Sequence, residues 1–124
     1  MLETTSSARI VLTTATHSDE ANRLARTLVE EQLAACATLL PAVESIYRWK
    51  GKTETSVETM LLLKTGTGQL SALEARLHQL HSYETPEFLV LSVEAGSQAY
   101  LAWMASGLIA PGEPGASSSK LADE

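Results

Sequence analysis

Cysteine, long apolar runs and targeting segments are almost absent from this sequence of 124 residues. Cys36 is the only cysteine, so no disulfide can form within one chain and nothing implies an oxidising compartment. No stretch approaches the roughly 20 apolar residues that a membrane-spanning helix needs. Residues 1–8 have no basic cluster followed by an apolar run, unlike a signal peptide. We therefore expect a soluble, cytoplasmic protein without membrane contacts.

Basic residues are also scarce, because nine Lys and Arg against fifteen Asp and Glu give a formal net charge of -6. Nucleic acids and anionic membranes attract clustered Lys and Arg, so this balance argues against binding to either. The sequence has no G-x-S-x-G elbow, no P-loop and no dinucleotide-binding glycine pattern. It thus assigns no catalytic residue, and we expect a protein that is not an enzyme.

The hydrophobic content of 44% is enough for one core in a chain of this length, whereas two domains would leave both cores too small. Three parts are expected. They are a flexible N-terminus at residues 1–8, one domain at residues 9–105, and a disordered tail at residues 106–124, where Gly, Pro and Ser become frequent.

Hydrophobic periodicity predicts strands and helices in a regular order within this domain. Helices are expected to begin near residues 18 and 67, with a short one at 97–104, and strands at residues 9–15, 37–49, 53–65 and 87–94. Ser18 is expected to cap the first helix, and Glu31 to lie on its solvent side. Pro41 cannot donate to a strand ladder, which predicts an edge strand or a bulge there. A turn at residues 50–52 would join the two middle strands into a long hairpin.

This order of strand, helix, strand, strand, helix, strand is typical of the ferredoxin-like α+β fold, with an antiparallel sheet. Both helices would then cover one face of the sheet. The other face would be partly apolar and bare, and an exposed apolar patch of several hundred Å² usually marks an interface. The sequence therefore predicts self-association.

Five motifs stand in a fixed order along the chain. They are LAACATLLP (residues 33–41), SIYRWKGK (45–52), LLLKT (61–65), HSYETPEFLVL (81–91) and YLAWM (100–104). Together they resemble the CutA family of divalent-cation tolerance proteins, over about residues 9–104. The resemblance implies a homotrimer similar in architecture to the PII signalling proteins, joined through the sheet face and the long hairpins. It also implies a role in tolerance of copper and other divalent cations.

Two positions depart from the family pattern. Some bacterial relatives carry a cysteine in the first strand that is implicated in copper binding, whereas this chain has Thr13 at the matching place. The frequent His-Pro-Tyr of the family is His81, Ser82 and Tyr83 here. The first change removes a soft ligand, so a copper site must be built differently or be weaker.

Cys36 and His81 are the candidate metal ligands. Cysteine sulfur suits Cu(I), but a free cysteine is commonly a small buried hydrophobe. His78 and His81 could face one ion together, or simply lie at a solvated helix end. We expect copper or another divalent cation to bind weakly and not to be required for folding. A closed zinc site is not supported, because no His or Cys has a partner at a recognised spacing.

Lys64 shares one face of an otherwise apolar strand with Met60, Leu62 and Glu58. An unpaired ammonium is costly to bury, so Lys64 must reach solvent or find a partner. Glu87 of another subunit is the candidate partner. Such a pair is compatible with an interface salt bridge and with a ligand-binding pocket.

Polar side chains around Pro86 are the last candidate group. Pro86 fixes its own φ and favours an extended conformation of Thr85, which aims the neighbouring side chains reproducibly. They either belong to a rigid loop that merely starts a strand or, as the resemblance favours, line a cleft between subunits. The candidates for this ligand-binding cleft are Tyr47, Trp49, Glu58, Lys64, Tyr83, Thr85 and Glu87.

The leading hypothesis is therefore a homotrimer that binds metal ions, copper among them, in divalent-cation tolerance. Two alternatives remain open. One is a PII-like sensor of a small molecule that binds in the cleft, and the other is a structural module whose hairpins organise other proteins.

Overall fold

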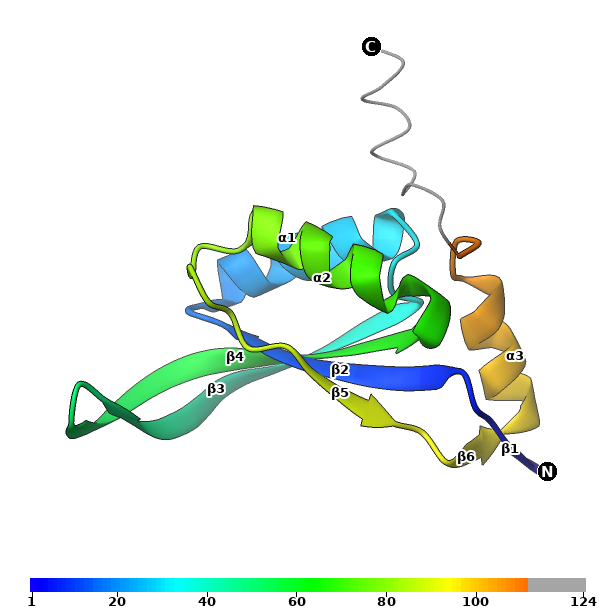
Figure 1. Cartoon of the computed structure of the whole chain (residues 1–124), viewed down its shortest axis with the longest axis horizontal. Coiled ribbons are helices and arrows are strands. Elements are labelled where there is room, and N and C mark those ends of the chain that lie inside the picture. The colour runs from blue at the N-terminus through cyan, green and yellow to red at the C-terminus, as the bar shows by residue number, and fades with distance from the viewer. Residues whose placement is uncertain (112–124) are drawn as a thin grey trace, which may run out of the picture.

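A computed structural model of the chain describes residues 1–111. Its elements are β1 (Leu2–Thr4), β2 (Ala8–Ala15), α1 (Ser18–Glu30), β3 (Cys36–Trp49), β4 (Lys52–Gly66), η1 (Thr67–Gln69), α2 (Leu70–Leu80), β5 (Leu89–Ser92), β6 (Ala95–Ser97) and α3 (Gln98–Ser106). The central antiparallel sheet has the strand order β3-β4-β2-β5 (Figure 1). Apart from β1, η1, β6 and α3, the elements follow the ferredoxin-like order, so the predicted fold class is confirmed.

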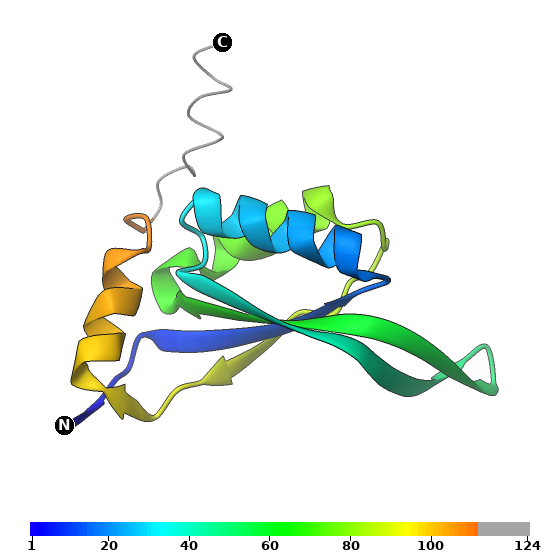
Figure 2. The same cartoon turned by 180° about the vertical axis from the view of Figure 1, so that it is seen from behind.

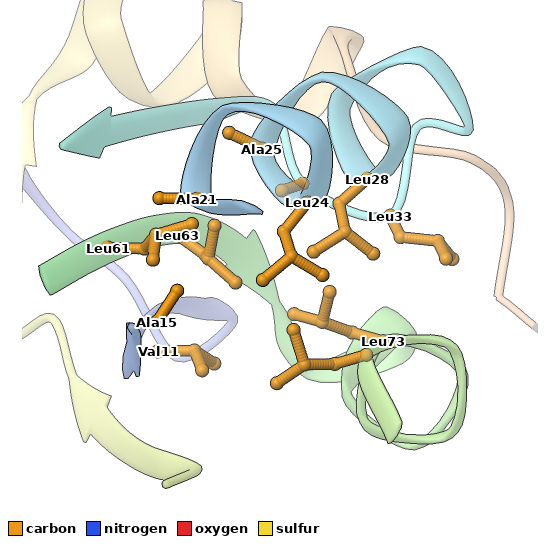
Figure 3. Packing of buried hydrophobic residues seen from close by; sticks show 12 residues of the cluster. Val11, Ala15, Ala21, Leu24, Ala25, Leu28, Leu33, Leu61, Leu63 and Leu73 are labelled. Atoms are coloured by element: carbon orange, nitrogen blue, oxygen red, sulfur yellow. The ribbon is translucent and has the colours of Figure 1, made fainter. Parts of the chain in front are cut away.

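The hydrophobic core lies between one face of this sheet and the helices α1 and α2 (Figures 1 and 2). The apolar residues of α1 recur at helical spacing and therefore form one inward stripe, while alternate residues of β2 and β4 point up to meet them (Figure 3). Each buried Leu or Val contributes about 1.5–3 kcal/mol. The residues at the centre are Val11, Leu24, Leu28, Leu61, Leu63, Leu73 and Leu77.

Strands β3 and β4 form a hairpin that reaches well beyond the body of the protein (Figure 1). Trp49 pairs with Lys52, so the turn has two residues, Lys50 and Gly51, with φ of 52° and 80°. Two positive φ values are typical of the hairpin turn that matches strand twist, and glycine adopts such an angle without strain. The register shifts between Leu40 and Val43, and β3 lies at the edge of the sheet. Both features confirm the prediction made from Pro41.

No helix of residues 1–111 covers the opposite side of the central sheet (Figures 1 and 2). Residues paired across antiparallel strands share a face, so Leu62 lies between its partners Leu12 and Thr38 on this side. Leu89 pairs with Leu12 and is 56% exposed. We call this surface the uncovered sheet face. It carries Ile10, Leu12, Leu40, Met60, Leu62, Leu89 and Leu91.

The two ends of the domain differ from the expected boundaries. Residues 1–8, predicted to be flexible, include β1, which pairs with β6 and is too short for periodicity to reveal. Beyond residue 105, the Ile109 amide donates to the Gln32 carbonyl at 2.9 Å, and Gln69 Nε2 donates to the Ile109 carbonyl at 2.6 Å. Packing therefore continues to Ile109. Residues 112–124 of the predicted tail lie outside the described residues.

Two local predictions in the first helix are wrong. The N-cap of α1 is His17, and no side chain caps the helix. The Ser18 hydroxyl lies 3.5 Å from the hydroxyl of Thr59 instead. Glu31 is completely buried rather than solvated, because α1 ends at Glu30 and the chain turns inward, where Arg76 of α2 binds both carboxylate oxygens at 2.8–3.1 Å.

Thr13 and Thr65 provide a matched test of buried hydroxyl groups, because both residues are completely buried. The Thr65 hydroxyl donates to the Leu33 carbonyl at 2.8 Å, whereas Thr13 Oγ1 has no hydrogen-bond partner within residues 1–111. Thr13→Val is expected to raise the free energy of unfolding by about 1 kcal/mol, since it removes an unpaired polar group. Thr65→Val is expected to lower the free energy of unfolding by about 1–2 kcal/mol, since it removes the hydroxyl that donates to the buried Leu33 carbonyl. Urea denaturation at one protein concentration measures both, and equal effects would contradict the assignment.

Candidate functional site

A cleft of about 700 Å³ lies between the long hairpin and the loop that follows α2, beside several of the candidate residues. Strand alternation places Tyr47 and Trp49 on one face of β3, and Glu58 of β4 faces the same way. Tyr83 and Thr85 approach from the loop. The cleft is lined by Tyr47, Trp49, Ser56, Glu58, Tyr83, Glu84 and Thr85.

The loop is held in place by hydrogen bonds to its backbone. The Tyr83 amide donates to His81 Nδ1 at 3.0 Å, so the other ring nitrogen, Nε2, carries the proton and donates to the Thr14 carbonyl at 2.7 Å. The Ser82 amide donates to the Glu20 carboxylate at 2.8 Å. Burial raises the pKa of Glu20, but the hydrogen bonds from Ser82 and Thr16, together with the neighbouring His81, outweigh it, so that the pKa lies below its ordinary value. These contacts fix the direction of the Tyr83 side chain.

Tyr83 connects the loop to the hairpin through its hydroxyl group. This hydroxyl donates to Glu58 Oε2 at 2.8 Å and accepts from the Thr16 hydroxyl at 3.0 Å. The pKa of Tyr83 is raised, first by burial and then by its contact with Glu58, because the nearby carboxylate disfavours a phenolate. Glu58 is only 9% exposed. The cleft therefore contains a fixed and largely buried carboxylate.

Glu87 is close enough to Glu58 for the two charges to interact. Burial raises the pKa of Glu87, and the negative charge of Glu58 raises it further. Two carboxylates that repel each other favour a cation between or beside them. Glu87, a sequence candidate for the cleft, is exposed and is not part of its lining, whereas Glu58 and Glu84 are. The charges of the lining thus suit a positively charged ligand.

Lys64 does not line the cleft within the chain. Its Nζ donates to the Thr38 hydroxyl at 3.0 Å and lies 3.7 Å from Cys36 Sγ. Lys64 pairs with both Ile10 and Cys36, which places it on the uncovered sheet face. Its predicted bond to Glu87 involves another subunit and stays a prediction.

Cys36 and His81 lie apart and offer poor conditions for a shared metal ion. Cys36 pairs with Lys64 of β4. The His81 ring binds the carbonyl of Thr14, which pairs with Met60 of the same strand. Met60 and Lys64 are about 13 Å apart along β4, which separates the two candidate ligands. Both nitrogens of His81 are already engaged. The ammonium of Lys64 beside Cys36 Sγ disfavours a cation there. Among residues 1–111, no three His, Cys, Asp or Glu side chains are grouped for a metal.

Sequence reasoning missed several residues of the site. Ser56 lies two positions from Glu58 and so shares its strand face, and Glu84 stands between Tyr83 and Thr85 in the loop. Strand alternation could have indicated Ser56, and its place between two candidates could have indicated Glu84. The supporting contacts of Thr16 and Glu20 join residues 67 and 62 positions apart, and no local pattern indicates such pairs.

The bare four-stranded sheet, the long hairpin and the cleft beside it define a PII-like protein of the ferredoxin-like fold. The CutA1 divalent ion tolerance protein family matches residues 9–107 of the chain. Divalent-cation tolerance protein CutA of Pectobacterium atrosepticum is 46% identical over 101 residues, which cover 82% of this chain and 92% of that protein. The chain belongs to the CutA family.

Solved structures agree with this assignment. CutA from Synechococcus elongatus PCC7942 superposes with a TM-score of 0.85 at 40% identity, covering 88% of this chain and 96% of that one. CutA1 from Oryza sativa gives a TM-score of 0.82 at 34% identity, covering 86% and 98%. A relative from Archaeoglobus fulgidus, with 30% identity, a TM-score of 0.78 and coverage of 81% and 97%, is described as periplasmic. No helix within residues 1–111 is long and apolar enough to cross a membrane.

Proposed function

We propose that this chain works without catalysis as a homotrimer that binds divalent metal ions, copper among them, and so contributes to divalent-cation tolerance. The observation that carries metal binding is the carboxylate of Glu58, which is nearly buried in the cleft. Its oxygens would hold the ion, and a bound divalent cation would supply a positive charge beside this carboxylate. One carboxylate is an incomplete ligand set, so binding is expected to be weak.

The uncovered sheet face supports the trimer. A contiguous apolar surface on one side of a sheet is costly to leave in water, and three copies of the chain would shield it. Lys64 would then face a neighbouring subunit, and its ammonium group could form the predicted salt bridge with Glu87 of that subunit. The cleft beside the hairpin would lie at the boundary between subunits. We also propose that the trimer is cytoplasmic, because a single cysteine forms no disulfide within the chain and nothing in the sequence implies an oxidising compartment.

Glu58→Gln is expected to weaken Cu(II) binding by at least about tenfold in calorimetric titration, because it removes a charged ligand without changing the shape of the side chain. Cys36→Ser is expected to leave Cu(II) binding unchanged. The matched control is Glu74→Gln, at an exposed position on α2. Loss of Cu(II) binding in Cys36→Ser, with no loss in Glu58→Gln, would transfer the site to the thiol and overturn the proposed ligands.

A small organic ligand is the second candidate, and the size of the cleft favours it. A volume of about 700 Å³ is far more than one metal ion fills, and it lies within the range of small-molecule sites. CutA from Synechococcus elongatus has been solved in complex with Bis-Tris, at 40% identity to this chain. Thermal-shift screening against amines, nucleotides and organic anions tests this candidate, and no response to any of them would remove it.

A further inference from the structure

Aromatic side chains form the walls of the cleft. Tyr47 and Trp49 stand on the hairpin, and Tyr83 stands opposite on the loop. A ligand that lies against these large rings gains apolar contact. The faces of such rings also attract cations, and Lys50 Nζ already lies 5.9 Å from the centre of the Trp49 ring.

The charged groups that line the cleft all have one sign. Glu58 and Glu84 are part of the lining, and no Lys, Arg or His belongs to it within residues 1–111. Tyr83 occupies Oε2 of Glu58, whereas no hydrogen bond of the described residues reaches Oε1. This side chain is nine-tenths buried and belongs to the lining of the cleft, so its second oxygen is an acceptor without a hydrogen-bond partner among the described residues.

We propose that the organic ligands of this cleft are alkylated ammonium ions, with the cation seated between the aromatic rings and the Glu58 carboxylate. The inference rests on the proposed use of the cleft as a ligand site and specifies the chemical class. A bare metal ion would use the carboxylates and leave the aromatic rings exposed. An organic ammonium ion uses both, because its alkyl groups cover the rings while its charge faces Glu58. Anionic ligands would be repelled by Glu58 and Glu84.

Choline and its uncharged analogue 3,3-dimethylbutanol test this class directly, because they share a shape and differ in charge. Both are titrated into the full chain in phosphate buffer, since amine buffers would compete. Choline is expected to bind at least about tenfold more tightly than the alcohol. Glu58→Gln and Trp49→Leu are each expected to weaken choline binding about tenfold or more, while Glu74→Gln leaves it unchanged.

The outcomes separate this inference from the proposed function. Equal binding of choline and the alcohol, or choline binding that survives both cleft variants, would overturn the ammonium class. The ammonium class is also overturned if choline fails to bind while Cu(II) still binds in a manner that depends on Glu58. In that case, metal binding remains as the proposed function of the cleft. If choline binds and Cu(II) does not, the ammonium class stands and the metal half of the proposed function is lost.

Discussion

Arg76→Ala is expected to lower the free energy of unfolding by about 3 kcal/mol, one of the largest effects of any single substitution in this chain. Arg76 supplies every hydrogen bond to the Glu31 carboxylate that the described residues contain, at 2.8–3.1 Å. The Glu31 side chain is 0% exposed and that of Arg76 is 23% exposed. Removal of the guanidinium would leave a carboxylate without a partner in the interior. Because Arg76 is partly exposed, water can enter after the truncation, which places the cost at the low end for buried pairs.

Urea denaturation at a fixed protein concentration measures this loss. The double variant Glu31→Leu/Arg76→Leu is the informative control, since replacing both charges with apolar groups removes the unpaired carboxylate. It is expected to be more stable than Arg76→Ala alone. A cost of Arg76→Ala below about 0.5 kcal/mol, typical of an ordinary surface position, would contradict this account of the pair.

Leu62→Glu is expected to abolish self-association. Leu62 lies in the middle of the uncovered sheet face, between Leu12 and Thr38. A carboxylate at that position would have to be desolvated without a partner whenever two copies meet. This penalty of several kcal/mol corresponds to a weakening of association by about a thousandfold or more. Sedimentation equilibrium should then give the 13.3 kDa mass of one chain in place of three times that mass.

Leu2→Glu is the matched control for this experiment. Leu2 is 77% exposed on β1 and belongs to the small second sheet, away from the uncovered sheet face. The same change of residue type is therefore expected to leave the assembly intact. If Leu62→Glu remained associated while keeping its fold, the uncovered sheet face would not be the interface.

Local pattern explains why the order of the elements was predictable. Alternation in β2 and β4 and the repeat of apolar residues in α1 each depend on neighbours within one element, as does the bulge at Pro41. The burial of Glu31 was not predictable in this way. Its position continues the polar side of α1, and only the packing of α2, which brings Arg76 from 45 residues away, makes burial possible.

In the candidate site, too, local patterns were predictable from the sequence and tertiary contacts were not. Tyr47, Trp49 and Glu58 were indicated by strand alternation along one hairpin, and Tyr83 and Thr85 by the rigid sequence around Pro86. The contact between Tyr83 and Glu58 depends on where the loop after α2 lands against the hairpin, which is tertiary information. The placement of Lys64 beside Thr38 likewise follows from the register of β3 and β4 rather than from its apolar surroundings.

Anomalous diffraction at the copper edge from crystals grown with Cu(II) tests the central claim most directly. The account predicts a peak in the cleft beside Glu58, repeated around a threefold axis that relates three chains. A peak at Cys36 or His81 with an empty cleft would contradict it, as would a crystal in which the uncovered sheet face contacts only solvent.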